Sequence, residues 1–294
     1  MTVSAAAGIS TKSHWSVGGR TLEITGPILL GIVNATPDSF SEGGVSFSPD
    51  RAITRALGLL RQGADIVDVG GESTRPGADP VGMDEELRRV IPVIEGVRAA
   101  APEALISVDT VKSEVARLAL SAGASIVNDV SGMRLDAAMA GVCARAGCGV
   151  VLMHSRGDIG EMASYAMADY GADPVGDVKR ELGESVERAV AAGIARSSIV
   201  VDPGFGFSKT SGHSLALLRE LERIAGLGFP VLVGVSRKRM IGELTGVTNP
   251  AERDAGSVGV AVVALLRGAR LFRVHDVALH RQALDAAWGV LRGQ

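Results

Sequence analysis

Short runs of apolar, often β-branched residues recur along the chain, and segments with a helical spacing of apolar residues lie between them. The runs are nearly continuous, which is typical of parallel strands buried on both faces. We predict strands at residues 28–34, 64–71, 105–109, 125–129, 149–154, 198–202, 230–236 and 270–276. Helices are predicted between them, for example at residues 50–62, 84–100, 111–122, 174–192 and 277–291. Eight such alternations favour an α/β fold, the TIM (β/α)8 barrel.

Nearly every apolar run ends in a polar residue. These residues are Asn34, Glu72, Asp109, Asn128, Asp129, His154, Asp202, Ser236, Arg273 and His275. In a barrel the carboxyl ends of all strands meet on one face, where the active site forms. A doubly wound open sheet would instead spread these groups along a crevice. A polar end on each of the repeated units favours the closed barrel.

A hairpin is predicted before the first strand, because residues 14–24 contain Gly18-Gly19 between two short runs of alternating character. We expect it to close the bottom of the barrel. The length of 294 residues suits one barrel of roughly 250 residues with little to spare. We therefore expect a flexible tail at residues 1–13 and a single barrel domain over residues 14–294.

Composition narrows the function classes. The chain is 46% hydrophobic and 3% aromatic, and its net charge is −3, which does not favour a nucleic-acid surface. No run approaches the ~18 apolar residues of a membrane span, and residues 1–11 lack the pattern of a signal peptide. We expect a cytoplasmic protein. Cys143 and Cys148 show no metal-ligand pattern and are expected to be buried thiols.

Three acids at strand ends, Asp109, Asp129 and Asp202, would be costly to bury without partners. Each can cap a following helix, an alternative that fits Asp202 less well because Pro203-Gly204 follows it. Carboxylates and a strand-end amide such as that of Asn128 also match the donor and acceptor edge of a flat heterocycle. The sequence therefore indicates a site for a small polar heterocycle, with the capping alternative open.

Basic residues follow the last two strands, at Ser236-Arg237-Lys238 and Arg273-Val274-His275. The last two strand–helix units of such barrels often bind phosphate, and arginine suits phosphate oxygens. Ordinary surface solvation is the alternative for such a run. The loop 204–210 offers Phe205 or Phe207 to cover an aromatic ligand, although either ring can instead belong to the core. No zinc spacing is present, but Mg²⁺ needs only one or two protein ligands when a diphosphate supplies the others.

Taken together, ordered motifs between Ile28 and Asp276 resemble the dihydropteroate synthase family. They read GIVNATPDSFS from Gly31, DVGGESTRPG from Asp68, SVDT from Ser107, NDVSG from Asn128, DPGFGF from Asp202, SRK from Ser236 and RVHD from Arg273. Any one motif is weak, but the ordered set is specific.

The resemblance implies a transferase of folate biosynthesis. Such an enzyme joins (7,8-dihydropterin-6-yl)methyl diphosphate to para-aminobenzoate with Mg²⁺, and gives 7,8-dihydropteroate and diphosphate. The implied pterin-binding residues are Asp109, Asn128, Asp202 and Lys238. Those for the diphosphate are Asn34, Thr74, Arg75, Arg273 and His275, with Asn34 also a metal ligand. Those for aminobenzoate are Phe40, Thr74, Pro76, Phe205 and Ser236.

The implied catalytic residues are Asp109, Lys238, Arg273 and His275. The resemblance also implies a homodimer, small-molecule substrates without nucleic acid or membrane, and inhibition by sulfonamides. We expect Arg273→Ala and Lys238→Ala each to abolish most turnover while leaving the fold intact.

The sequence departs from the family pattern at a few positions. Ala35 stands in place of a common Val, Ser155 in place of a frequent Met, Ser208 in place of the usual Gly, and Arg239 follows the SRK motif. Two other readings compete with a synthase. A pterin-binding methyltransferase domain would leave the phosphate-binding set unexplained, and a non-catalytic paralogue would more often have lost one of these residues.

Overall fold

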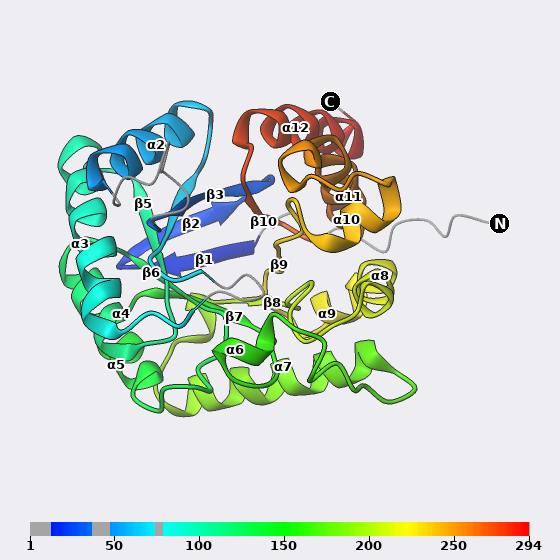
Figure 1. Ribbon diagram of the computed structural model, residues 1–294, viewed down its shortest axis with the longest axis horizontal. Coiled ribbons are helices and arrows are strands. Elements are labelled where there is room, and N and C mark those ends of the chain that lie inside the picture. The colour runs from blue at the N-terminus through cyan, green and yellow to red at the C-terminus, as the bar shows by residue number, and fades with distance from the viewer. Residues whose placement is uncertain (1–12, 37–47, 74–78, 294) are drawn as a thin grey trace.

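Eight parallel strands form the centre of the molecule. The structure is a computed structural model, and it describes residues 13–36, 48–73 and 79–293. The strands are β3 (Ile28–Asn34), β4 (Ile66–Gly70), β5 (Leu105–Asp109), β6 (Ile126–Asp129), β7 (Gly149–Met153), β8 (Ile199–Asp202), β9 (Leu232–Val233) and β10 (Leu271–Val274). They pair in the order β8-β7-β6-β5-β4-β3-β10-β9, and a bridge between Val201 and Val231 joins the two ends. The predicted barrel is confirmed (Figure 1).

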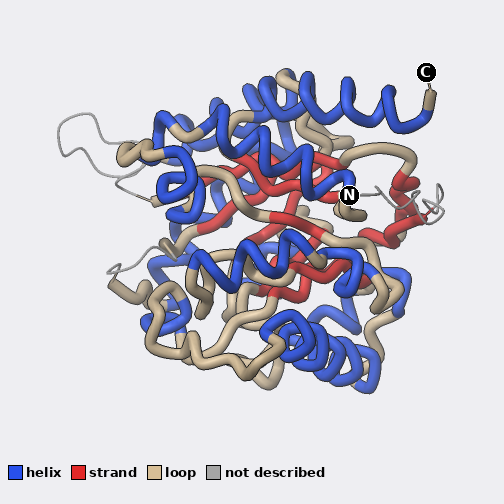
Figure 2. The backbone as a smooth tube through the Cα atoms, turned by 90° about the vertical axis from the view of Figure 1, so that its right-hand side faces the viewer, coloured by secondary structure: helices blue, strands red, loops and turns tan. Residues whose placement is uncertain are grey.

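Helices surround the strands (Figures 1 and 2). They are α2 (Pro49–Arg61), α3 (Met83–Ala100), α4 (Ser113–Ser121), α5 (Met139–Ala146), α6 (Ile159–Met162), α7 (Pro174–Ala191), α8 (Ser211–Arg219), α9 (Leu221–Ala225), α10 (Arg239–Thr245), α11 (Asp254–Leu266) and α12 (Val277–Arg292), with short 3-10 turns η1 (Arg196–Ser198) and η2 (Pro250–Glu252). In α3 the buried residues Val90, Val93, Ile94 and Val97 recur at helical spacing. That stripe packs against the barrel, as an amphipathic helix should.

The strand predicted at residues 230–236 is much shorter in the structure, where β9 covers two residues. Val231 still accepts backbone hydrogen bonds from Arg270 and Leu271. Beyond Val233 the chain turns, because the Lys238 amide donates to the Val235 carbonyl and Arg237 adopts a left-handed φ of 60°. The residues predicted as the end of a strand therefore form a turn at the rim of the barrel.

The hairpin of β1 (Ser13–Val17) and β2 (Arg20–Ile24) lies at one end of the barrel (Figure 2). Trp15 is fully buried and donates from Nε1 to the Ser198 carbonyl at 2.8 Å. It packs with inward-facing residues of the strands, among them Leu30 and Ile126. The predicted closure of the barrel bottom is confirmed. Of the tail expected at residues 1–13, only Ser13 is described, and it begins β1.

None of the helices in the described ranges is long and apolar enough to cross a membrane.

Candidate active site

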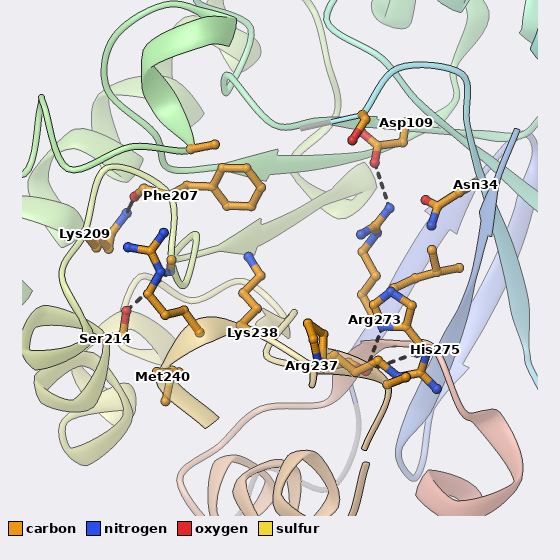
Figure 3. Close-up of a pocket in the computed structure, with 18 of the residues that line it drawn as sticks. Asn34, Asp109, Phe207, Lys209, Ser214, Arg237, Lys238, Met240, Arg273 and His275 are labelled. Carbon is orange, nitrogen blue, oxygen red and sulfur yellow. Dashed lines mark hydrogen bonds and ion pairs between the residues drawn. The ribbon is translucent and has the colours of Figure 1, made fainter. Parts of the chain in front are cut away.

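A cavity of about 740 Å³ opens at the carboxyl ends of the strands. Residues from β3, β5, β10 and the loops after β7, β8 and β9 line it, and Figure 3 shows several of them. The lining includes Asn34, Asp109, Ser236, Lys238, Arg273 and His275. Six of the residues predicted for the site therefore share one cavity.

Arg273 joins two carboxylates across the barrel, the fully buried Asp68 and the partly buried Asp109. Its Nε donates to Asp68 Oδ2 at 2.6 Å, and one terminal nitrogen donates to Asp109 Oδ2 at 2.7 Å. Asp68 is fully buried, and the Asn128 amide also donates to its Oδ2 at 3.2 Å. These contacts fix the guanidinium in one orientation at the floor of the cavity, as two charge-assisted hydrogen bonds would.

The interior of the barrel becomes polar within one strand length. Side chains two residues apart share a face of a strand, so the inward face of each strand changes from an apolar to a polar residue towards its carboxyl end. The pairs are Ile66 and Asp68, Ile126 and Asn128, Val200 and Asp202, and Leu271 and Arg273. Asp109 follows Leu105 and Ser107 in the same way on β5. The strands therefore bring Asp68, Asn128, Asp109, Asp202 and Arg273 to adjacent layers without any loop being involved.

Burial has the largest effect on the pKa values of the charged residues at this site. It raises the pKa of Asp109 to about 7 despite the Arg273 guanidinium, and it raises the pKa of Asp202, whose Oδ1 accepts from the Gly204 amide at 2.7 Å. Burial also lowers the pKa of Lys238 to about 7, against the attraction of Asp202. A lysine and a carboxylate whose pKa values both lie near 7 are typical of functional sites.

Lys238 is held by the loop after β8. Its ammonium donates to the Phe205 carbonyl and lies 4.0 Å from the centre of the Phe207 ring. Figure 3 shows Lys238 and Phe207 between Lys209 on one side and Arg273 on the other. The pair forms a wall in which a cation rests on an aromatic face.

Ser236 and His275 contact one another at the rim. The Ser236 hydroxyl lies 3.0 Å from His275 Nδ1 and accepts from the His275 amide at 3.2 Å. The neighbouring Arg237 turns away to Asp254, to which it donates through Nε and a terminal nitrogen. The three residues of the SRK motif therefore point in different directions. Ser236 contacts His275, and Lys238 contacts the loop after β8. The Arg237 guanidinium stabilises the turn through Asp254.

Several predicted residues lie elsewhere. Phe205 is fully buried in the core and does not line the cavity, whereas Phe207 does. The prediction that Phe205 faces an aromatic ligand is therefore wrong, and Phe207 is the ring that lines the cavity. Asp129 accepts from the amides of Ser131 and Met133, so that its role is to stabilise a turn, as in the capping alternative. Phe40, Thr74, Arg75 and Pro76 lie outside the described residues.

Asp68 is a residue of the site that the sequence does not predict, although it begins the motif DVGGESTRPG. It precedes the polar strand end by four positions, in the middle of a run that otherwise reads as buried. A charged residue in such a run, with apolar Ile66 on the same strand face, indicates a buried functional side chain. Lys209 was also missed. It lines the cavity and is almost fully buried.

Within the described ranges no cluster of three His, Cys, Asp or Glu residues could hold a metal ion. The cavity does offer the amide oxygen of Asn34 beside the cations of its floor. One hard oxygen ligand fits Mg²⁺, which keeps several waters and takes further oxygens from a bound diphosphate.

Comparisons with known proteins agree with this site. A family model described as pterin binding enzyme matches residues 30–275. The dihydropteroate synthase of Escherichia coli K12 is 44% identical over 259 residues, which cover 88% of this chain and 90% of that protein.

Solved structures give the same result. Xanthomonas albilineans dihydropteroate synthase with 4-aminobenzoic acid has a TM-score of 0.89 at 45% identity, and covers 97% of this chain and 100% of that one. The same enzyme in complex with 7,8-dihydropteroate has a TM-score of 0.85 at 42% identity, over 96% of this chain and 99% of that one. The chain belongs to the pterin-binding enzymes and, among them, to the dihydropteroate synthases, transferases of folate biosynthesis.

Proposed function

We propose that this cavity binds (7,8-dihydropterin-6-yl)methyl diphosphate and para-aminobenzoate and joins them into 7,8-dihydropteroate. The observation that carries the proposal is the placement of buried carboxylates and of Lys238 and Arg273 around one space of about 740 Å³. That volume lies in the range of small-molecule sites. The Xanthomonas structures, which hold 4-aminobenzoic acid or 7,8-dihydropteroate, support the same assignment.

The pterin ring is assigned to the floor. Asp109 and Lys238 line the cavity, and Asn128 and Asp202, which are not among the lining residues, are proposed for the pterin from the sequence. A carboxylate at Asp202 accepts from the amino group and the N3 edge of the ring, and Lys238 reaches its carbonyl side. Because the site is buried, these hydrogen bonds are made in a low dielectric and are strengthened accordingly.

The diphosphate is assigned to the side of the cavity that holds Arg273, His275 and Asn34. Arg273 stabilises the charge that develops on the leaving group. Thr74 and Arg75 are also proposed to bind the diphosphate, on the basis of the sequence alone. The aminobenzoate is assigned to the wall formed by Phe207 and to Ser236, with Phe40, Thr74 and Pro76 again proposed from the sequence.

The chemistry follows from these placements. The bond between the methylene carbon and the diphosphate oxygen breaks, and its electron pair leaves with the diphosphate. The electron-rich dihydropterin and the nearby carboxylates stabilise the cation that remains, and the aminobenzoate nitrogen attacks it and then loses one proton. An aniline nitrogen is a neutral nucleophile at pH 7, so no strong general base is needed. A buried cavity also keeps water from the cation.

Mg²⁺ is proposed as the cofactor, with Asn34 as its protein ligand. When bound, the ion supplies neutralisation of the diphosphate charge. Replacing Asn34 with Ala should raise the Mg²⁺ concentration needed for half-maximal activity, with little change in the melting temperature. An unchanged Mg²⁺ dependence would remove Asn34 from this role.

A homodimer and a cytoplasmic location are also proposed. Helix α11 exposes Val263 and Leu266, and has no charged residue after Asp254. An exposed apolar helix face of this kind suits a symmetric contact between two copies. Light scattering of the wild type and of Val263→Glu tests the dimer.

The two buried free thiols, Cys143 and Cys148, suit a reducing compartment, which supports the proposed cytoplasmic location.

The test of the proposed reaction is diphosphate release with the dihydropterin diphosphate and Mg²⁺, with and without para-aminobenzoate. We expect release that depends on aminobenzoate, yields dihydropteroate, and is inhibited by a sulfonamide. Pterin binding by calorimetry without release would instead indicate a non-catalytic paralogue.

A further inference from the structure

Lys209 has a buried amino group with no carboxylate hydrogen-bonded to it among the described residues, and burial lowers the pKa of Lys209 well below its usual range. It is 1% exposed, and its amino group contacts three acceptors: His154 Nδ1 at 2.8 Å, the His154 carbonyl at 3.3 Å and the Phe207 carbonyl at 2.9 Å. A lysine amino group has at most three protons, and these three acceptors leave none of them for a ligand. Lys209 therefore lines the cavity but directs its donors to the protein.

His154 is oriented by a second contact. Its Nε2 lies 2.9 Å from Oε2 of Glu181 on α7. Because a carboxylate only accepts, Nε2 carries the proton and Nδ1 is left as the acceptor for Lys209. Burial lowers the pKa of His154 to about 4, which keeps the ring neutral in this tautomer at physiological pH. The direction of donation runs from Lys209 to His154 to Glu181.

The same amino group fixes the loop that carries the aromatic wall. Gly204 has a φ of 70°, and a Cβ there would lie 1.9 Å from the His154 carbonyl, so the loop passes directly against His154. Lys209 then binds the Phe207 carbonyl, and the Phe207 ring lies 4.0 Å from the Lys238 ammonium. A continuous set of contacts thus connects Glu181, His154, Lys209, Phe207 and Lys238.

We propose that Lys209, oriented by His154 and Glu181, is a positioning residue that sets the place of Phe207 and hence the binding of aminobenzoate. It touches neither reacting atom in this role. The inference rests on the proposed assignment of aminobenzoate to the Phe207 wall. The groups that face Lys209 are Asp202, Lys238, Arg156, Glu181 and the Tyr170 ring, whose centre is 6.0 Å from Nζ.

The first experiment is Lys209→Met, which keeps the length of the side chain and removes all three donors. We expect KM for aminobenzoate to rise roughly tenfold, and KM for the pterin diphosphate to change less than twofold. A purely structural role would change both constants together or only the melting temperature. Equal changes in the two KM values would overturn the proposal.

The matched pair His154→Asn and His154→Leu tests the orientation step. The Asn side-chain oxygen can take the place of Nδ1 as acceptor, whereas Leu cannot. We expect Asn to retain most of the affinity for aminobenzoate and Leu to lose it. If Lys209→Met does not fold, this pair decides the question, and the same KM in both variants contradicts the proposal.

Phe207→Leu separates this inference from the proposed function. If it leaves KM for aminobenzoate unchanged, the assignment of aminobenzoate to this wall is wrong, and the role of Lys209 is lost with it. If Phe207→Leu raises that KM and Lys209→Met does not, only the positioning role is wrong. Nitrogen-15 NMR of the His154 ring gives an independent readout, because Nδ1 should shift when Lys209 no longer donates to it.

Discussion

The two ends of the barrel interior differ in chemistry although the same strands form both. Towards the hairpin, Leu30, Ile66, Ile126, Val200 and Leu271 pack with Trp15 into an apolar layer. Two residues further along, the same faces present Asp68, Asn128, Asp202 and Arg273. The first layer contributes stability by burying apolar area, and the second places charges in a low dielectric, which is costly unless they are paired.

The two layers separate stability from chemistry within one fold. Substitutions at the hairpin end should change the free energy of unfolding and leave turnover alone. Substitutions at the cavity end should change turnover first, because the side chains proposed to bind the substrates lie there. Strand ends near the active site are where this architecture places its reactive groups.

The largest effect should come from Arg273→Ala. We expect kcat/KM to fall by at least about 100-fold, because a donor to the developing charge is lost. The fold should stay intact but lose stability, because Asp68 and Asp109 lose their cation, which costs roughly 3–5 kcal/mol when a buried pair is broken. Steady-state kinetics and thermal unfolding check both parts.

The control for Arg273→Ala is Arg270→Ala at the other end of the same strand. The Arg270 guanidinium donates to the Ala269 carbonyl and stacks on Trp288. It should lower the melting temperature and leave kcat/KM near the wild-type value. Comparable losses of turnover in the two variants would contradict the separation of the two ends.

The hairpin end is tested by Trp15→Ala. Removal of this fully buried ring should destabilise the protein by about 3–5 kcal/mol, while kcat of the folded enzyme stays unchanged. Trp15→Phe keeps most of the apolar area and loses the hydrogen bond to Ser198, so its cost should be smaller, about 1 kcal/mol. Chemical denaturation measures both. A large fall in kcat for Trp15→Ala would show that the two ends are coupled.

Much of this fold could be predicted from periodicity. The runs of β-branched residues predicted the barrel strands, and Gly18-Gly19 predicted the hairpin turn, in which both glycines have positive φ. The short β9 could not be predicted, because Gly234-Val235-Ser236 has the composition of a strand. Its departure from the sheet depends on distant residues: Arg253 donates to the Arg237 carbonyl and Asp254 binds the Arg237 guanidinium.

The side chains around the cavity were predicted better where a strand carries them than where a loop does. The polar strand ends predicted Asp109 and Arg273, which line the cavity, whereas Asn128 and Asp202 are not among its lining residues. The choice between Phe205 and Phe207 could not be predicted, because Gly204 and Gly206 both have positive φ and reverse the chain direction locally. Alternation of faces has no meaning in such a loop. Lys209 could not be predicted for a different reason, because its partner His154 is 55 positions away.

The pH dependence of stability should distinguish Lys238 from Arg273, which is paired with two carboxylates, and this effect should be smaller. Burial lowers the pKa of Lys238 from 10.5 to about 7 in the folded protein. Between these pH values the unfolded chain binds more protons, so this residue makes stability rise with pH, by about 1.4 kcal/mol for each pKa unit as an upper bound. Below pH 7 both states are protonated and the full penalty remains.

The Lys238→Met variant should therefore show a weaker rise of stability between pH 7 and pH 10 than the wild type. The slope is the quantity to compare, since the substitution also removes the cation near Asp202. Denaturant unfolding at several pH values gives it. Parallel curves for the two proteins would mean that Lys238 keeps its ordinary pKa.

The smallest effect concerns Ser208, at a position where we expect Gly from the family pattern. Its φ is 49°, in the left-handed region that costs a residue with a Cβ roughly 1 kcal/mol. The hydroxyl compensates, since it donates to the Arg156 carbonyl at 2.7 Å and accepts from the Arg156 amide at 2.9 Å. Ser208→Ala keeps the strain and loses both bonds, so it should destabilise by about 1–2 kcal/mol. Ser208→Gly loses the bonds and the strain together and should stay closer to the wild type. If Gly proved the worse of the two in denaturant unfolding, the side chain would not be offsetting backbone strain, and the loops after β7 and β8 would be held together by other contacts.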